Sequence, residues 1–199
     1  NREVLQSTSV SKTVTVTKLE VQPVFPKVWL DIPEDLTMDQ PFTVTVMVSG
    51  DGNISAADMQ FTYDSTLLEV TDVAPAQSSK EDFSGLTVTA NPAKFQNGKG
   101  VFTVISMDGI TEETALVNIT LKALENPPSA AEWETQIAVS ASGVVDRTGD
   151  DVVVQPGTSL LTIQVPVYTV TFLEHDGTLL KQQPVFYLNA AAAPEVQGK

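Results

Sequence analysis

The chain of 199 residues has no cysteine and only one histidine, and these absences remove several kinds of chemistry. Without cysteine there is no disulfide framework, no thiolate zinc site and no cysteine nucleophile. The histidine, His175, stands beside Asp176 among turn-forming residues, so we expect a solvated turn residue rather than a general base. The acidic residues are too scattered to single out the carboxylate pair that a glycosidase needs. We therefore predict that the chain is not an enzyme.

Basic residues are also scarce, with 11 lysines and arginines against 25 acidic residues and a net charge of −14. The acidic excess lies in residues 26–165, and no basic stripe is present to replace counterions on a nucleic acid or an anionic membrane surface. No apolar run of about 18 residues is present, so no membrane insertion is expected. The first residue is not Met and no signal peptide is visible, so we expect a fragment of a longer protein.

The most informative stretch is a strict alternation of apolar and polar residues that runs from Asp58 to Tyr63. Side chains on a β-strand point alternately to opposite faces. Met59, Phe61 and Tyr63 are therefore expected to face a core, while Asp58 and its alternating neighbours face outward. The outer face is polar but sparsely charged, which suits contact with another protein.

Composition and the spacing of turn-forming residues favour an all-β fold. Hydrophobic residues make up 42% of the chain, and Thr and Val recur at alternating positions without long amphipathic helices. Short apolar runs separated by turn residues are typical of a sandwich or barrel. The expected strands are Val28–Ile32, Pro41–Ser49, Ala57–Tyr63, Leu67–Val73, Leu86–Ala90, Gly100–Ser106, Ala115–Leu124, Thr135–Ser140, Val152–Val154 and Ser159–Gln164. The expected turns are Gly50–Asn53, Asn97–Gly98, Asp108–Gly109, Asn126–Pro128 and Thr148–Asp150.

Three parts are distinguished along the chain. Residues 1–26 form a Ser/Thr-rich linker or edge strand, and residues 27–165 form the main β domain. Residues 166–199 contain a β-hairpin closed by the Asp176-Gly177 turn. A lone hairpin is marginal in water, so this part either docks on the main domain or belongs to a larger module.

Some patterns leave alternatives open. Oxygen-bearing side chains cluster at residues 51–58 and 146–151, as in calcium loops, but we expect them to form turns and predict no metal site in this chain. Sugar binding needs aromatic platforms; Trp29 and Tyr63 are expected in the core, and Trp133 is the aromatic residue that we cannot place there. The strand at residues 100–106 has apolar residues at both its odd and its even positions, and therefore on both faces. The face that does not point to the core is then either covered by a loop or exposed to a partner.

At this point the sequence resembles a cohesin domain, the receptor module of bacterial cellulosome-type scaffolds. The resemblance covers about residues 27–165 and consists of five pieces in the family's order. They are Leu36–Gly50 before and along a long alternating strand, Phe61-x-Tyr63-Asp64-x-x-Leu67-Leu68-Glu69-Val70, the paired stretches Gly98–Ser106 and Ala115–Lys122, and the closing pieces Val144–Asp150 and Ser159–Ile163.

The resemblance implies a jelly-roll β-sandwich of about nine strands. It also implies a non-catalytic protein that binds a dockerin-bearing partner through the outer face of one sheet, with calcium in the dockerin and no cofactor in this chain. Asp58 stands where better-known members contact the dockerin. Alternation adds Gln60 and Thr62 to that face, and Phe102 and Val104 are expected beside them.

The C-terminal stretch Tyr168–Lys181 is similar to the start of the Listeria–Bacteroides surface repeat, a small β-grasp-like module, and looks truncated. Both resemblances imply an extracellular or bacterial cell-surface protein, with polysaccharide association possible through its parent. Two other functions stay open, because fold alone does not fix function. One is a structural or adhesive spacer, with a uniformly solvated face. The other is a carbohydrate-binding sandwich, with an aromatic strip that includes Trp133.

Overall fold

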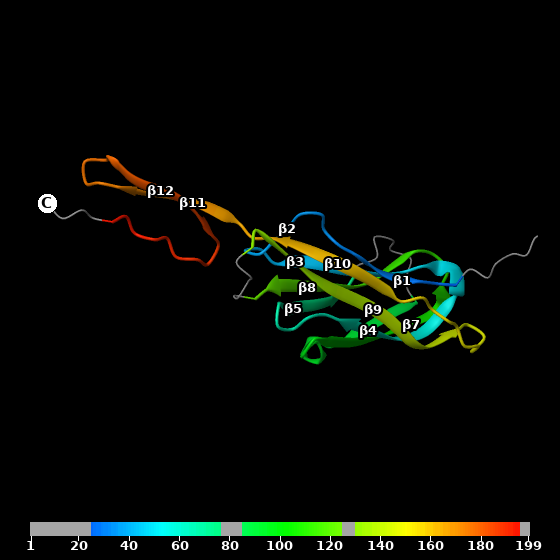
Figure 1. Ribbon diagram of the computed structural model, residues 1–199. Helices are drawn as coiled ribbons and strands as arrows, with labels where there is room; N and C mark the ends of the chain where they lie inside the picture. Colours follow the sequence, from blue (N-terminus) through cyan, green and yellow to red (C-terminus); the bar gives the residue numbers. More distant parts are fainter. Residues whose placement is uncertain (1–24, 77–84, 125–129, 196–199) are drawn as a thin grey trace, which may run out of the picture.

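The computed structural model describes residues 25–76, 85–124 and 130–195. Within these ranges the structure is all-β, with two short 3₁₀ turns, η1 (Gly50–Gly52) and η2 (Pro92–Lys94), and no α-helix (Figure 1). No helix in the described part of the chain is long and apolar enough to cross a membrane. The expected linker at residues 1–26 lies mostly outside the described residues, as does the turn at residues 126–128.

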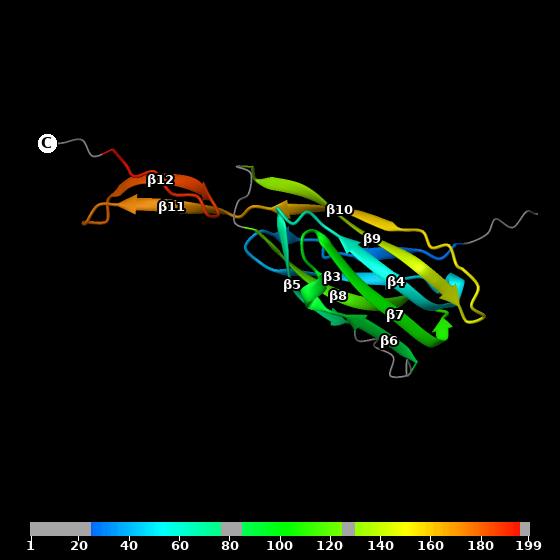
Figure 2. The ribbon, with the colours of Figure 1, turned by 90° about the horizontal axis from the view of Figure 1, so that it is seen from below.

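The predicted jelly-roll sandwich is confirmed: ten strands form two sheets that pack face to face (Figure 2). About nine strands were expected, and one of the ten, β2, has only two residues. All strand pairs are antiparallel except β2 with β10. One sheet has the order β1 (Val28–Asp31), β3 (Phe42–Val48), β8 (Thr114–Ala123) and β5 (Leu68–Pro75). The other has the order β2 (Leu36–Thr37), β10 (Gly157–Gln164), β9 (Glu132–Asp146), β4 (Ile54–Thr62), β7 (Lys99–Ile110) and β6 (Leu86–Ala90).

The core lies between the two sheets and is built by the alternating residues of each strand. On β4, Met59 and Phe61 are completely buried, as the alternation predicts, and Tyr63 is half-buried beside them. Phe61 and Tyr63 stack with ring centroids 5.7 Å apart. Removal of these apolar surfaces from water is the main favourable term that holds the sheets together.

Two expected features were wrong. The segment Val152–Val154 is not a strand, because its flanks make single bridges to different partners, Asp151 to Val145 and Gln155 to Lys27. The expected turn at residues 108–109 lies inside β7, which continues to Ile110. A Cβ on Gly109 would lie 2.0 Å from Asn53 Oδ1, so the glycine here allows a close approach of two elements rather than a turn.

The other described turns form where the sequence predicts them. Asn97 and Gly98 both have positive φ, 55° and 79°, and join Gln96 to its bridge partner Lys99 in a two-residue hairpin. The cluster of oxygen-bearing side chains at residues 146–151 forms a capped turn, in which Asp146 Oδ1 accepts hydrogen bonds from the backbone N–H groups of Thr148 and Asp150. No group of three or more potential metal ligands occurs among the described residues.

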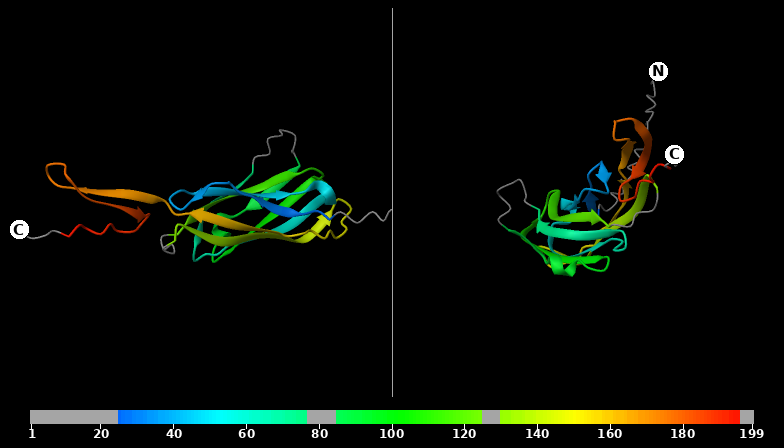
Figure 3. Two further views of the ribbon diagram at one scale, coloured as in Figure 1. Left: turned by 45° about the horizontal axis from the view of Figure 1, so that its top comes forward. Right: turned by 90° about the vertical axis from the view of Figure 1, so that its left-hand side faces the viewer.

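The C-terminal hairpin pairs β11 (Val167–Leu173) with β12 (Leu179–Phe186) around the expected Asp-Gly turn. It extends from the end of the sandwich opposite the start of β1 (Figures 1 and 3). His175 is exposed in the turn, as expected. The Tyr168 hydroxyl donates to Asp39 Oδ2 across the junction at 3.4 Å, and Lys181 Nζ donates to the carbonyl oxygen of Ala192 in the tail.

Two carboxylates that cap turns, Asp64 and Asp146, make the free energy of unfolding depend on pH in the acidic range. Hydrogen bonds from the Thr66 side chain and backbone lower the pKa of Asp64, and those from Thr148 and its neighbours lower the pKa of Asp146. Each cap is fully formed above the ordinary carboxyl pKa of 3.8 and is lost as the pH falls through the lowered folded-state pKa.

We expect the double variant Asp64→Ala/Asp146→Ala to be less stable at neutral pH and to lose less further stability below pH 3.8 than the wild type. Urea unfolding from neutral to acid pH measures this difference. The control is Asp31→Ala, which removes an exposed strand carboxylate. If the free energy of unfolding fell equally steeply below pH 3.8 in the double variant and in the wild type, the role given to the two caps would be contradicted.

Candidate partner-binding face

Asp58 lies near the middle of the six-stranded sheet, on β4, and points outward. It pairs with Thr103 of β7 and with Ser142 of β9. Thr103 Oγ1 donates to Asp58 Oδ1 at 2.8 Å, and Ser142 Oγ donates to the Asp58 carbonyl oxygen at 3.4 Å. The described residues give Asp58 Oδ2 no hydrogen bond, so this oxygen can accept one from a partner.

Gln60 and Thr62 share the outer face with Asp58, as the alternation predicts. Gln60 lies between Val101 and Ser140, and both of its neighbours are uncharged. Thr62 lies between Lys99 and Ala138 toward the end of the sheet. Residues directly opposite each other in an antiparallel pair point to the same face, so these rows define one continuous surface.

The expected positions of Phe102 and Val104 beside Asp58 are wrong. Phe102 is 2% exposed and Val104 is completely buried, so both face the core. The physical reason is contact with a loop: a Cβ on Gly100 would lie 2.1 Å from the Phe95 ring, which places Gly100 on the inner face. Residues of the same parity on β7 follow it inward.

The side chains that do lie beside Asp58 were missed by the sequence interpretation. They are the odd-numbered residues of β7, whose side chains point outward; Val101 is 42% exposed and Ile105 is 50% exposed. Thr87 and Thr89 of β6 extend the rows beyond Ile105 and Thr103. The signal was present, since the strand is apolar at both parities, but alternation alone does not say which parity faces the core.

Exposed apolar residues distinguish the two sheets. Of the large apolar residues exposed on the described strands of the sandwich, all lie on the six-stranded sheet; they are Val101, Ile105, Met107 and Leu160. On the outer face of the four-stranded sheet, polar side chains of β3 and β8 instead bond to each other, with a hydrogen bond of 3.1 Å between the Thr43 and Thr120 hydroxyls and one of 2.8 Å from the Thr45 hydroxyl to Asn118 Oδ1. The six-stranded sheet is therefore the face suited to a partner.

Trp29, Tyr63 and Trp133, the aromatic residues considered for sugar binding, do not form a strip on the described sandwich. Trp133 is only 7% exposed, so the residue that a carbohydrate-binding strip would need is in the core. Trp29 is half-exposed rather than buried, because Val28 and Leu30 take the inner positions of β1. Lys27 Nζ lies 5.1 Å from the centroid of the Trp29 ring, in a cation–π contact on the four-stranded sheet.

The orientation of β7 can be tested by two neighbouring substitutions. We expect Phe102→Ala to reduce the free energy of unfolding by about 3–5 kcal/mol, because it opens a cavity in the core. We expect Val101→Ala to change it by about 0.5 kcal/mol or less, because the side chain is at the surface. Urea denaturation of both variants measures the difference, and equal losses would contradict this orientation.

Comparison with known proteins agrees with this architecture. The family model of the cohesin domain matches residues 28–165. A non-cellulosomal cohesin from the archaeon Archaeoglobus fulgidus is 16% identical, with a TM-score of 0.50 over 70% of this chain and 91% of that one. A cohesin module of a Clostridium perfringens family 33 glycoside hydrolase is 15% identical, with a TM-score of 0.50 over 70% and 97%.

The structure is also similar to one from a type I cohesin–dockerin complex of Clostridium thermocellum, at 12% identity and a TM-score of 0.52 over 74% of this chain and 99% of that one. No curated protein matches the chain by sequence. At these identities the solved structures support the fold, and the family match covers most of the chain, including the whole sandwich. The chain belongs to the cohesin family of non-catalytic interaction modules.

Proposed function

We propose that this cohesin domain binds a dockerin-bearing protein through the outer face of the six-stranded sheet, with Asp58 at its centre. The observation that carries the proposal is the surroundings of this carboxylate. Thr103 holds one of its oxygens, and the described residues give the other no hydrogen bond. Val101 and Ile105 expose apolar surface on the adjacent strand. Interfaces of this kind combine an apolar contact region with a few oriented hydrogen bonds.

The scarcity of charge on this face favours tight contact. The neighbours of Asp58 and Gln60 across both adjacent strands are hydroxyl-bearing or apolar, although the chain as a whole carries a net charge of −14. Few charges then lose their hydration when the face is covered. Asp58 itself needs a donor from the partner, because a buried unpaired carboxylate is costly.

The nature of the partner is proposed from the family. The partner carries a calcium-loaded dockerin, and this chain contributes no metal. The similar Clostridium thermocellum structure is a cohesin–dockerin complex, and the Archaeoglobus fulgidus relative is described as non-cellulosomal, so the partner is not restricted to cellulosome enzymes. An extracellular or cell-surface setting follows from the same proposal, with any polysaccharide association made through the parent protein.

We assign the C-terminal hairpin to a surface repeat of the Listeria–Bacteroides type. This assignment is supported by the β-hairpin that forms over residues 167–186. It is also supported by apolar side chains that the hairpin leaves exposed, among them Leu173, Leu179 and Leu180. Such a hairpin is too small to be stable alone in water, so it fits a module that is completed by further structure.

Calcium-dependent capture tests the dockerin proposal directly. The immobilised full chain is incubated with proteins secreted by the source organism, in calcium and in EDTA, and bound proteins are identified by mass spectrometry. We expect capture of a protein with paired calcium-loop repeats in calcium and its release in EDTA. Absence of such a protein, at concentrations that detect micromolar binding, would contradict the proposal and favour a structural spacer.

Substitutions on the two sheets then locate the interface. With the captured dockerin, we expect Asp58→Ala to weaken binding by about 1–3 kcal/mol, or roughly 5- to 150-fold in Kd, because a buried hydrogen bond is lost. Ile105→Ala is expected to weaken binding by about 1 kcal/mol or more. Lys122→Ala, on an exposed position of the four-stranded sheet, is the control. Isothermal titration calorimetry measures all three, and loss of binding only in the control would place the interface on the other sheet.

A further inference from the structure

The strand β6 forms one edge of the six-stranded sheet, and among the described residues it pairs only with β7 (Figure 2). Its five residues, Leu86–Ala90, have the sequence Leu-Thr-Val-Thr-Ala, with no charge and no proline. The register with β7 runs through all five pairs without a bulge. An edge strand of this kind presents a row of backbone groups with which another strand can pair.

The other three edges of the described sandwich are protected. The strand β2 has only two residues, and the outer edge of β1 is used where the Val28 N–H donates to the Gln155 carbonyl oxygen at 3.0 Å. The strand β5 carries Glu69 and Asp72, is interrupted by a register shift and ends at Pro75. Short length, charge, irregular register and proline are the usual means by which an edge strand avoids pairing. The strand β6 has none of them.

The backbone groups at this open edge are identified by the ladder with β7. Directly before β6, the Met107 N–H donates to the Gly85 carbonyl oxygen at 3.0 Å. Hydrogen-bonded and non-hydrogen-bonded pairs alternate along an antiparallel ladder, so Thr87 and Thr89 bond to β7. The N–H and C=O groups of the three apolar residues of β6 therefore point to the open edge.

The side chains of these apolar residues are incompletely covered. Leu86, Val88 and Ala90 lie on the core side of the sheet and pack against the core, yet each is only half-buried. Thr87 and Thr89 are exposed on the outer face. The burial stops short because the described part of the chain places no further strand beyond β6. A strand added here gains backbone hydrogen bonds and apolar contact together.

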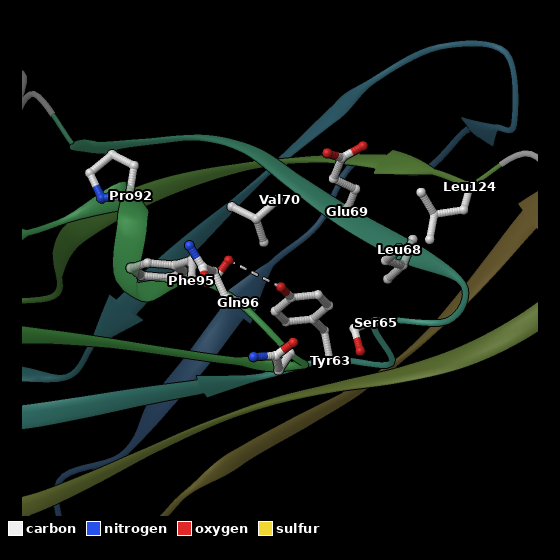
Figure 4. A pocket seen from close by; sticks show the side chains of 10 residues that line it. Tyr63, Ser65, Leu68, Glu69, Val70, Pro92, Phe95, Gln96 and Leu124 are labelled. Atoms are coloured by element: carbon white, nitrogen blue, oxygen red, sulfur yellow. Dashed lines mark hydrogen bonds between the residues drawn. The ribbon is translucent and has the colours of Figure 1, made fainter.

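The edge is already ordered at its C-terminal end. Directly after β6, Asn91 Oδ1 accepts a hydrogen bond from the Ala93 N–H and caps η2. The Tyr63 hydroxyl donates to the Phe95 carbonyl oxygen at 3.3 Å, which ties the end of η2 to the residue that follows β4 (Figure 4). A strand that is held in this way loses little conformational entropy when it pairs.

From these observations we infer that β6 pairs with β6 of a second copy of this chain, antiparallel and about a two-fold axis at Val88. This register sets Val88 opposite its own copy and Leu86 opposite Ala90, so every backbone group that points to the open edge finds a partner. It also sets Thr87 opposite Thr89 on the outer face, and threonine pairs of this kind stabilise neighbouring strands. The edge is therefore complementary to itself.

Charge explains why a copy can meet this edge and no other. Each chain has a net charge of −14, so two copies repel each other, but β6 brings none of that charge into the contact. Salt screens the repulsion that remains, so the pairing should strengthen with ionic strength. With five residues from each copy, the contact is smaller than a standard interface, and we expect a Kd of about 0.1–1 mM.

The pairing joins two six-stranded sheets into one continuous sheet. Thr87 and Thr89 lie opposite Ile105 and Thr103, so the partner-binding faces of the two copies meet along β6 and lie on the same side. Together with the proposed function, one dimer presents two such faces to dockerin-bearing proteins. The pairing itself does not depend on that function.

Sedimentation equilibrium of the full chain, from about 10 µM to about 1 mM and in about 50 mM and 500 mM sodium chloride, tests the inference. We expect a monomer–dimer equilibrium whose Kd is at least about twofold lower at the higher salt concentration. At that salt concentration, Thr87→Glu/Thr89→Glu is expected to raise the Kd by about tenfold or more, because carboxylates then lie directly opposite each other. Both side chains are exposed, so the fold should be retained.

The matched control is Thr169→Glu/Thr171→Glu, which adds the same charge at exposed positions of the C-terminal hairpin. Its Kd should stay close to that of the wild type. This control also separates pairing through β6 from association through the apolar side chains of the hairpin.

Single cysteines test the register, because the chain has no cysteine of its own. Opposite residues in an antiparallel pair have Cβ atoms about 4.5–5.5 Å apart, close to the separation in a disulfide. In oxidised glutathione, a mixture of Thr87→Cys and Thr89→Cys should therefore form disulfide-linked dimers faster than either variant alone.

Three results would overturn the inference. One is a monomer at all concentrations in both salt conditions. The second is a dimer that the hairpin variant weakens as much as the β6 variant does. The third is cross-linking that is no faster in the mixture than in the separate cysteine variants. Dockerin capture is measured separately with Asp58→Ala, so failure of either proposal is distinguishable from failure of the other.

Discussion

The pairing register of β4 with its two neighbours is the constraint on which the rest of the structure depends. Burial of Met59 and Phe61 fixes which face of β4 is inside, and this places Asp58 outside. A slip of one residue would move the whole apolar set to solvent and the carboxylate into the core. The same register brings Thr103 to Asp58, so the hydrogen bond at the proposed interface depends on core packing.

Phe95 connects the loop that follows η2 with the orientation of β7. Its ring packs against Gly100, so the inner parity of β7 begins there and continues through Phe102 and Val104. The same loop carries the Asn97-Gly98 turn, whose Gly98 carbonyl oxygen accepts a hydrogen bond from the Tyr63 N–H. The loop therefore positions the outward residues of β7 as well as the end of β4.

The two faces of the sandwich show how similar composition supports different roles. Both outer faces are rich in threonine, but on the four-stranded sheet the threonine side chains bond to one another and to Asn118. On the six-stranded sheet they lie beside exposed Val101 and Ile105, and Asp58 Oδ2 accepts no hydrogen bond from the part of the chain that the structure describes. A surface whose polar groups already bond to each other gains little from a partner, whereas the second surface gains from being covered.

The sequence by itself determined the all-β class, most strands, the turns at Asn97-Gly98 and Asp176-Gly177, and the outward direction of Asp58, Gln60 and Thr62. These features follow from local alternation and turn chemistry. Only the tertiary structure decided the parity of β7, the burial of Trp133 and the use of Gly109 in a close approach rather than a turn. A strand that is apolar on both faces carries no local signal for its orientation, and that orientation was set by Phe95 packing against Gly100.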